Sequence, residues 1–298
     1  MAVKVILNGY FRSGTSFLYK ALKSNLKNHV SFYEPLHHRL GLIINTTIEG
    51  DIDDVHQQRI TDEYHRLSFD AKKKLLLNHP NTTLNGIQGE RALLDYISLY
   101  NDMKSNVFLQ TNRMHFYLDV VREEYDAKVI HIVRHPLDVY NSMKNTSFRD
   151  TGFKRFIEKF FKIRNMYELE KDFYWCLRHT GKPKGYYHSW KIRFFDSKFS
   201  FKKFVAVWII ANYYAIKTLE EKGLVCAYEK ILENPDKEFK RISDYLGVSD
   251  FQSPDVKKGN CYKFSKKQAD KFIKTTKEMG LEAELAYITK NLKVNYFK

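Results

Sequence analysis

Short apolar runs alternate along the chain with stretches in which apolar residues recur at helical spacing. The runs are four to six residues long and rich in aliphatic and aromatic side chains, as strands buried on both faces are. They predict five strands: Val3–Leu7, His29–Tyr33, Asn106–Leu109, Lys128–Val133 and Leu224–Ala227. Helical spacing predicts helices at Ser16–Leu26, at His115–Tyr125, from Pro136 onward and at Pro235–Leu246. Strands that alternate with helices predict an α/β fold with a central parallel sheet flanked by helices.

Two stretches interrupt this alternation. Residues 153–201 carry many aromatic and basic residues without a clean period, and we expect them to form a helical, aromatic-rich insertion at about residues 150–200. Residues 265–298 show the spacing of two amphipathic helices, which predicts a helical C-terminal tail. The sequence contains no internal repeat and no linker rich in Gly, Pro or Ser, so we predict a single domain over residues 1–298.

The composition is that of a basic, folded protein. Lys and Arg number 50 against 35 Asp and Glu, which gives a formal net charge of +15. Such a surplus favours an anionic ligand, a nucleic acid or an acidic membrane surface as the partner. A hydrophobic share of 43% supports a sizeable core and excludes wholesale disorder, and only 13 Gly and 6 Pro exclude a collagen-like chain.

Cysteine usage and targeting signals narrow the setting. Cys176, Cys226 and Cys261 are widely spaced, which predicts reduced thiols rather than a disulfide framework or a zinc site. The richest apolar stretch, Phe204–Ile216, falls short of a membrane span, and the start of the chain lacks the apolar core of a signal peptide. We therefore expect a cytoplasmic protein, and leave open peripheral membrane contact or an anchor removed from the N-terminus.

The segment from Gly9 to Ser16, Gly-Tyr-Phe-Arg-Ser-Gly-Thr-Ser, carries the most specific signal in the sequence. It follows a predicted strand and opens a predicted helix, the setting in which backbone N–H groups and a helix N-terminus bind a phosphate. Gly14 lets the backbone approach an anion, and Arg12 adds a cation. Three hydroxyl donors complete the loop: Ser13, Thr15 and Ser16. The segment therefore predicts a P-loop-type sheet whose first loop binds phosphate.

This loop departs from the pattern of nucleotide kinases. Its two glycines keep the Walker A spacing, but Thr15 stands where the lysine for the β- and γ-phosphates belongs. The strand Val129–Val133 runs into Arg134 and offers no aspartate for Mg²⁺. We therefore expect phosphate binding without a metal ion, and keep a P-loop nucleotide kinase as the alternative enzyme.

The Arg-Ser-Gly-Thr-Ser loop after a strand resembles the 5′-phosphosulfate loop of sulfotransferases that use 3′-phosphoadenosine 5′-phosphosulfate (PAPS). The stretch Val133–Ser142 resembles the family's 3′-phosphate site, where an Arg at a strand end and a Ser eight residues later bind the phosphate. Arg134 and Ser142 keep that spacing. The resemblance implies PAPS as the donor and adenosine 3′,5′-bisphosphate (PAP) as the product. The residues it implies at the nucleotide are Arg12, Ser13, Gly14, Thr15, Ser16, Arg134 and Ser142.

Two further motifs extend the resemblance toward the C-terminus. Tyr228 begins a Tyr-Glu-Lys-Ile stretch similar to the "YEDL…NP…FLG" stretch of the family, whose Tyr contacts the adenine. The resemblance implies this role for Tyr228, against the alternative of a buried core residue. Lys257, Lys258 and Gly259 resemble the basic glycine loop that closes on the 3′-phosphate in the cytosolic branch, against the alternative of an ordinary solvated loop.

Some positions depart from the cytosolic branch of the family. That branch carries lysine in the phosphate loop, whereas Arg12 makes this chain similar to tyrosylprotein and many bacterial sulfotransferases. The cytosolic branch also has a catalytic His after its middle strand, and Gln110–His115 offers no His in the expected place. The general base therefore has to be sought elsewhere.

Sulfuryl transfer needs a group that stabilises charge and a group that takes a proton. Arg12 is suited to the charge that develops on the leaving phosphate. We predict Glu34 as the base, because it follows a strand beside the loop and Pro35 should hold it in an extended conformation. A Glu at this place is the base of the tyrosylprotein branch, and the Tyr-Glu-Pro stretch is similar to one in Golgi carbohydrate sulfotransferases. A structural salt bridge is the alternative role for Glu34, and His115 is the reserve base.

The sequence therefore predicts a PAPS-dependent sulfotransferase that acts on an acceptor hydroxyl of a carbohydrate or glycolipid. Aromatic residues of the insertion, such as Tyr174, Trp175 and Trp190, either stack on sugar rings or form the insertion's own core. A basic, non-enzymatic nucleic-acid-binding protein is the remaining alternative. No helix-turn-helix, RRM or zinc signature accompanies the positive charge, so we expect no nucleic acid among the partners.

Overall fold

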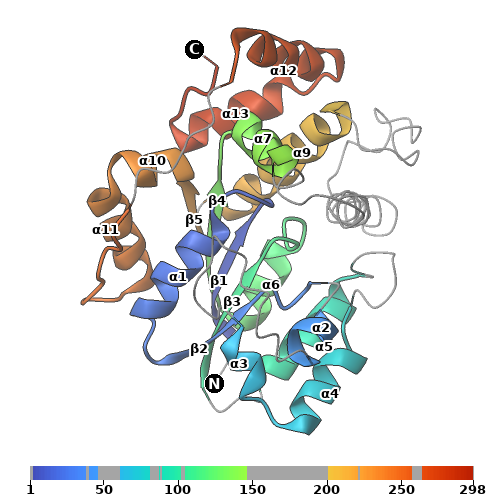
Figure 1. Ribbon diagram of the computed structural model, residues 1–298, viewed down its shortest axis with the longest axis vertical. Coiled ribbons are helices and arrows are strands. Elements are labelled where there is room, and N and C mark those ends of the chain that lie inside the picture. Colours follow the sequence, from blue (N-terminus) through green and yellow to red (C-terminus); the bar gives the residue numbers. More distant parts are fainter. Residues whose placement is uncertain are drawn as a thin grey trace.

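The structure, a computed structural model, describes residues 3–37, 40–45, 61–80, 87, 89–101, 105–145, 201–220, 222–256 and 264–297. Within these residues, five strands form one sheet in the order β2-β3-β1-β4-β5, and every neighbouring pair is parallel. The strands are β1 (Val3–Gly9), β2 (His29–Tyr33), β3 (Asn106–Thr111), β4 (Lys128–Val133) and β5 (Leu224–Ala227). All five predicted strands are present, and the predicted α/β fold with a parallel sheet flanked by helices is confirmed (Figure 1).

Helices follow and connect these strands. In chain order the described helices are α1 (Thr15–Asn25), α2 (Leu40–Asn45), α3 (Asp62–His65), α4 (Phe69–Leu77), α5 (Glu90–Asn101), α6 (Leu118–Tyr125), α7 (Pro136–Asn145), α9 (Phe201–Leu219), α10 (Tyr228–Glu233), α11 (Pro235–Leu246), α12 (Lys266–Glu278) and α13 (Glu282–Leu292). The last two confirm the two predicted helices of the C-terminal tail. The insertion expected at about residues 150–200 lies outside the described residues.

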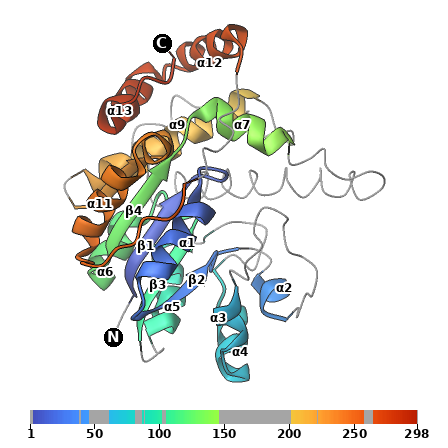
Figure 2. The same cartoon turned by 60° about the vertical axis from the view of Figure 1, so that its left-hand side comes forward.

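Alternate residues of each strand pack against opposite layers of helices. On β1, Val5 and Leu7 pack with α1 and α11, whereas Ile6 packs on the other face with α5, α6 and α9. Figures 1 and 2 show these helices on the two sides of the sheet. Because both faces are covered, the strands appear in the sequence as continuous apolar runs rather than as alternating ones.

The richest apolar stretch of the sequence forms α9. Most of its side chains are buried, and it packs on β4 and β5 on one side and on α12 and α13 on the other. Within the described parts of the chain, no helix combines the length and the apolar character needed to span a bilayer.

Parallel strands bring their carboxyl ends to the same edge of a sheet. The segments that follow β1 to β5 accordingly carry five polar side chains to one edge: Arg12, Glu34, Asn112, Arg134 and Tyr228. In Figure 1, α7, α12 and α13 lie beyond this edge. In open α/β sheets this carboxyl edge is the place where ligands bind.

Candidate active site

The phosphate loop turns sharply between β1 and α1. The Ser13 N–H donates to the Tyr10 carbonyl at 3.1 Å, and Gly14, with φ of 92°, is the N-cap of α1. A Cβ on Gly14 would lie 2.4 Å from Cδ2 of Tyr228, so the backbone angle and the available space both require glycine. The first turn of α1 carries no acidic residue. The partial positive charge of the helix N-terminus is therefore not offset by its own first turn.

The three hydroxyls of the loop have different surroundings. Ser13 is fully buried, and its Oγ has no hydrogen-bond partner within the part of the chain that the structure describes. Thr15 is buried beside Gly9, where a Cβ would lie 2.7 Å from the Thr15 methyl group. Ser16 pairs with the hydroxyl of Tyr33 and so links α1 to β2. A phosphate oxygen is the kind of partner that the buried Ser13 hydroxyl lacks.

Two arginines meet beside this loop. The Nε of Arg12 donates to Oγ of Ser142 at 3.0 Å, and Nη1 of Arg134 donates to the Arg12 carbonyl at 3.3 Å. The Arg134 guanidinium also lies 4.8 Å from the centre of the Tyr228 ring and 3.9 Å from the Asp138 carboxylate. The structure thus brings together the residues of the two motifs, which lie more than 120 positions apart in the sequence.

The ring of Tyr228 lies between the phosphate loop and Arg134. Its half-buried ring lies against Gly14 on one side, contacts Phe17 edge-on at 6.4 Å and is covered by the Arg134 guanidinium. This position beside both phosphate candidates is compatible with an adenine contact, which stays a prediction. The other predicted nucleotide residues, Lys257, Lys258 and Gly259, lie outside the described residues.

Glu34 lies at the carboxyl end of β2 and is 5% exposed. Its N–H donates to the Gln110 carbonyl at 2.9 Å and to Gln110 Oε1 at 3.3 Å, and its carboxylate accepts a hydrogen bond from Nδ2 of Asn112. The expectation that Pro35 holds Glu34 extended is wrong, because φ of Glu34 is 51°. The chain turns here instead: the His37 N–H donates to the Glu34 carbonyl at 2.9 Å, with Pro35 at the second position of the turn.

Arg12 and Glu34 share a strained backbone conformation. Among the residues that the structure describes, four that are not glycine have left-handed φ values: Arg12, Glu34, Asp126 and Lys293. Asp126 and Lys293 end helices, where this conformation is common. Arg12 and Glu34 are in loops at the carboxyl edge of the sheet, and strain of about 1–3 kcal/mol per residue clusters at functional sites. The two residues predicted to be catalytic are thus also the two that depart from ordinary backbone geometry outside helix ends.

The reserve base, His115, lies beneath the site. Its side chain has no exposed surface, and neither ring nitrogen has a hydrogen-bond partner among the described residues. Its ring contacts those of His131 and Tyr10, and burial holds its pKa well below the usual value. The described residues leave no exposed surface on this ring, and the choice of Glu34 over His115 as the base stays a prediction.

A buried polar chain that sequence reasoning missed runs under the edge of the sheet. His131 Nε2 donates to Asn212 of α9 at 3.0 Å, and Asn8 Nδ2 donates to His131 Nδ1 at 3.0 Å. Asn8 Oδ1 in turn accepts the Met114 N–H at 3.2 Å, which holds the loop that carries Asn112. Burial lowers the pKa of His131 to about 4, so the ring is neutral at neutral pH and offers one donor and one acceptor. The only sequence signal for this chain of hydrogen bonds was His131, a histidine inside an otherwise apolar strand.

The C-terminal segment closes on the loop after β4. The ring of His135 stacks on Phe264 at 4.3 Å, and its Nε2 donates to the Tyr296 carbonyl at 2.8 Å. The backbone N–H of His135 donates to Glu229 at 2.7 Å. Burial raises the pKa of Glu229 to about 7. His135, the residue next to Arg134, is therefore held through its backbone by α10 and through its ring by the C-terminal segment.

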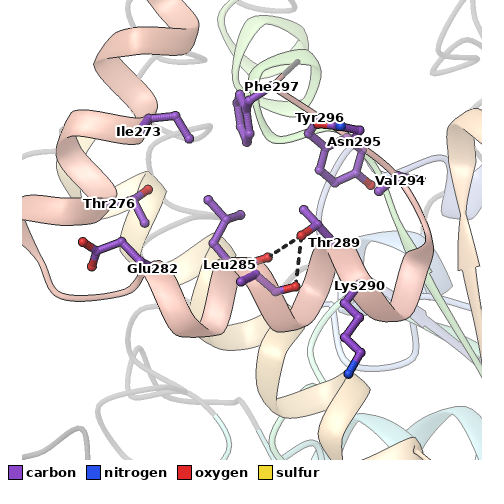
Figure 3. Close-up of a pocket in the computed structure, with 11 residues that line it drawn as sticks. Ile273, Thr276, Glu282, Leu285, Thr289, Lys290, Val294, Asn295, Tyr296 and Phe297 are labelled. Carbon is purple, nitrogen blue, oxygen red and sulfur yellow. Dashed lines mark hydrogen bonds between the residues drawn. The ribbon is translucent and has the colours of Figure 1, made fainter.

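A groove of about 440 Å³ lies between α12, α13 and the C-terminal segment (Figure 3). Ile273, Leu285 and Phe297 line it with apolar side chains, and the Thr289 hydroxyl is hydrogen-bonded to carbonyls of its own helix, including that of Leu285 at 3.1 Å. None of the residues predicted from the phosphate motifs lines this groove. The arginines and the phosphate loop therefore form a site distinct from it.

A model of the Sulfotransferase domain family matches residues 3–291 of the chain. The chain belongs to this family. It is therefore a PAPS-dependent sulfotransferase, and the resemblance carried by the two phosphate motifs is confirmed. A protein of Archaeoglobus fulgidus, described as an uncharacterized protein, is 28% identical over 269 residues, which cover 83% of this chain and 84% of the relative.

Three solved structures of sulfotransferases are also similar. The sulfotransferase from Alicyclobacillus acidocaldarius and the sulfotransferase domain of the Synechococcus PCC 7002 olefin synthase are each 14% identical, with a TM-score of 0.46 and coverage of 99% of this chain and 97% of theirs. The sulfotransferase domain from the curacin biosynthetic pathway is 13% identical, with a TM-score of 0.48 and 99% coverage of both chains. Family membership rests on the sequence match over residues 3–291.

Proposed function

We propose that this sulfotransferase moves the sulfuryl group of PAPS to a hydroxyl of a carbohydrate or glycolipid at the carboxyl edge of its sheet. The observation that carries the proposal is the meeting of Arg12, Ser142 and Arg134 beside the N-terminus of α1. Two arginines held together concentrate positive charge, and a phosphate dianion is the partner that neutralises it with the best geometry.

The residues present suit the donor nucleotide. The buried Ser13 hydroxyl and the N-terminus of α1 provide unused donors for the 5′-phosphate, with Gly14, Thr15 and Ser16 completing the loop. Arg134 and Ser142 would hold the 3′-phosphate, and Tyr228 would contact the adenine. Lys257, Lys258 and Gly259 would close on the 3′-phosphate from a segment outside the described residues.

The transfer itself requires charge stabilisation and one proton acceptor. The acceptor oxygen attacks the sulfur in line, while the bond from sulfur to the 5′-phosphate oxygen breaks and its electron pair leaves with PAP. Arg12 stabilises the charge on the leaving phosphate, and Glu34 takes the proton of the acceptor hydroxyl. The strand before Glu34, β2, is separated from β1 by β3, so the expectation of a strand directly beside the loop is wrong. The buried position of Glu34 at the same carboxyl edge of the sheet and the strained backbone of both residues support these roles.

Two features of the sequence support a carbohydrate or glycolipid as the acceptor. The Tyr33-Glu34-Pro35 stretch is similar to one in Golgi carbohydrate sulfotransferases, and the net charge of +15 suits an acidic glycan or a glycolipid at a membrane surface. The aromatic residues that would stack on sugar rings lie in the segment outside the described residues.

The proposal is tested by transfer of labelled sulfate from PAPS to a panel of glycans, glycolipids, phenols and tyrosine peptides in the presence of EDTA. We expect label on a glycan or glycolipid. Label on phenols or peptides alone would overturn the acceptor class while leaving the donor chemistry intact. Turnover that depends on added Mg²⁺ and ATP would overturn the donor chemistry as well.

A further inference from the structure

Three buried residues close a ring of hydrogen bonds at the carboxyl ends of β2 and β3. The Glu34 N–H donates to Gln110 Oε1 at 3.3 Å, and Gln110 Nε2 donates to Asn112 Oδ1 at 3.1 Å. Asn112 Nδ2 completes the ring by donating to Glu34 Oε1. All three residues are at most 5% exposed. We call Glu34, Gln110 and Asn112 the amide circuit.

The direction of every bond in the amide circuit follows from Glu34. Its backbone N–H can only donate, so Gln110 has to present its oxygen, and an ionised carboxylate oxygen can only accept, so Asn112 has to present its nitrogen. The remaining two groups, Gln110 Nε2 and Asn112 Oδ1, are then a donor that faces an acceptor. A proton on Glu34 Oε1 would instead set a donor against the Asn112 donor. The circuit therefore keeps Oε1 as an acceptor, so a proton taken from an acceptor hydroxyl would be carried by Oε2.

Gln110 is the last but one residue of β3, and it is directly opposite Tyr33, the residue before Glu34, in the register of β2 and β3. Asn112 lies in the bend directly after β3, where the chain brings its side chain to both Gln110 and Glu34. The circuit holds Glu34 at its N–H and at its carboxylate. Such a double constraint is what a buried residue with φ of 51° needs to keep one geometry.

We propose that Gln110 and Asn112 are positioning residues that orient Glu34 and favour its ionised form, so that it can accept the proton. The proposal rests on the assignment of Glu34 as the base. Burial alone favours the neutral acid, and a hydrogen bond donated to the carboxylate opposes that tendency. Asn112 supplies this donor, and Gln110 fixes the orientation of the Asn112 amide.

The direct test follows the ¹³C resonance of the Glu34 carboxyl carbon against pH in protein with labelled glutamate, assigned by its loss in Glu34→Gln. Asn112→Leu removes the donor at similar volume, and we expect the titration midpoint to move up by about one pH unit or more. Gln110→Met should move it in the same direction by less, and it serves as the second variant should Asn112→Leu not fold. Asn78→Ala, at the exposed end of α4, is the control and should leave the midpoint unchanged. An unmoved midpoint in the folded variants overturns the proposal.

Measurements of turnover distinguish the proposed role of Gln110 and Asn112 from the assignment of Glu34 as the base. With labelled sulfate transfer from PAPS to the best glycan of the panel, Asn112→Leu should lower kcat about 10- to 100-fold and move the acid limb of its pH profile upward, with the PAP-induced rise in melting temperature retained. Combining it with Glu34→Gln should add little further loss. Full activity of Glu34→Gln overturns the base assignment and this proposal with it. An inactive Glu34→Gln beside a fully active Asn112→Leu overturns only the role of the amide circuit.

Discussion

Arg12 and Ser142 are 130 positions apart in the sequence, and the Nε of Arg12 donates a hydrogen bond to Oγ of Ser142 at 3.0 Å. This contact joins the phosphate loop after β1 to helix α7 after β4. Because β1 and β4 are parallel neighbours, their carboxyl ends bring the two motifs to one place. The orientation of the Arg12 guanidinium is therefore set by a residue that also belongs to the proposed 3′-phosphate site.

Ser142→Ala removes the acceptor for Arg12 and one proposed ligand of the 3′-phosphate. We expect the affinity for PAP, measured by calorimetry, to fall about 10- to 100-fold, which corresponds to the loss of one hydrogen bond to a charged group. Ser98→Ala, at an exposed position of α5, is the matched control and should bind PAP as the wild type does. Equal affinities of Ser142→Ala and the wild type would show that Ser142 has no part in the site.

Arg134→Ala removes the guanidinium that lies between the phosphate loop and the Tyr228 ring. PAP should raise the melting temperature of the wild type without added metal, and we expect most of that rise to be lost in the variant, because a charged ligand of a phosphate contributes strongly to binding. Arg91→Ala changes an exposed arginine on α5 and should keep the full rise. A full rise in Arg134→Ala would contradict the predicted 3′-phosphate site.

Gly14→Ala places a methyl group against Tyr228 and forces alanine into a left-handed conformation. We expect a loss of stability of about 2 kcal/mol or more in urea unfolding, together with loss of PAP binding. The double variant with Gly14→Ala and Tyr228→Ala removes the steric contact but keeps the unfavourable φ. Gly14→Ala should therefore cost less stability in the Tyr228→Ala background than in the wild type. If the two substitutions are simply additive, the contact between them carries no energy.

Glu229 should make stability depend on pH. Burial raises its pKa from 4.5 to about 7, so the folded protein binds more protons than the unfolded chain between these values. Stability from this group is therefore fully present below about pH 4.5 and falls as the pH rises to about 7. Glu229→Gln keeps an acceptor for the His135 N–H but cannot ionise. The free energy of unfolding of Glu229→Gln, relative to that of the wild type, should therefore increase by on the order of 2 kcal/mol between about pH 4.5 and pH 8.

Urea unfolding at several pH values measures this difference. Glu233→Gln, at an exposed position of the same helix α10, is the matched control. A stability difference between Glu229→Gln and the wild type that stays constant with pH would show that Glu229 is not responsible.

Local sequence signals predicted the strands and the position of the two phosphate motifs between strand and helix, because both depend on residues that are close together in the chain. The five apolar runs became the five strands, and the Gly9–Ser16 loop opens α1 as its glycines and hydroxyls indicated. The spacing of Arg134 and Ser142 also predicted correctly that one ends a strand and the other lies on the next helix.

Contacts between distant segments could not be predicted in the same way. The bond between Glu34 and Asn112 spans 78 positions, and that between His135 and Tyr296 spans 161. The first depends on which strands become neighbours, and the second depends on where the segment after α13 packs. The apolar runs of the sequence encode neither. The conformation of Glu34 was missed for a related reason: the turn at Pro35 and the bonds to Gln110 on β3 overrode the local preference for an extended chain.

We propose that one site at the carboxyl edge of the sheet binds the donor nucleotide without metal and uses Glu34 as the base. The most direct measurement compares wild type and Glu34→Gln in EDTA, with the PAP-induced rise in melting temperature and the transfer of labelled sulfate from PAPS as the two readouts. We expect the variant to keep the rise in melting temperature and to lose turnover by about 10²- to 10⁴-fold. Turnover of the variant equal to that of the wild type, or no rise in the melting temperature of the wild type with PAP, would contradict the claim.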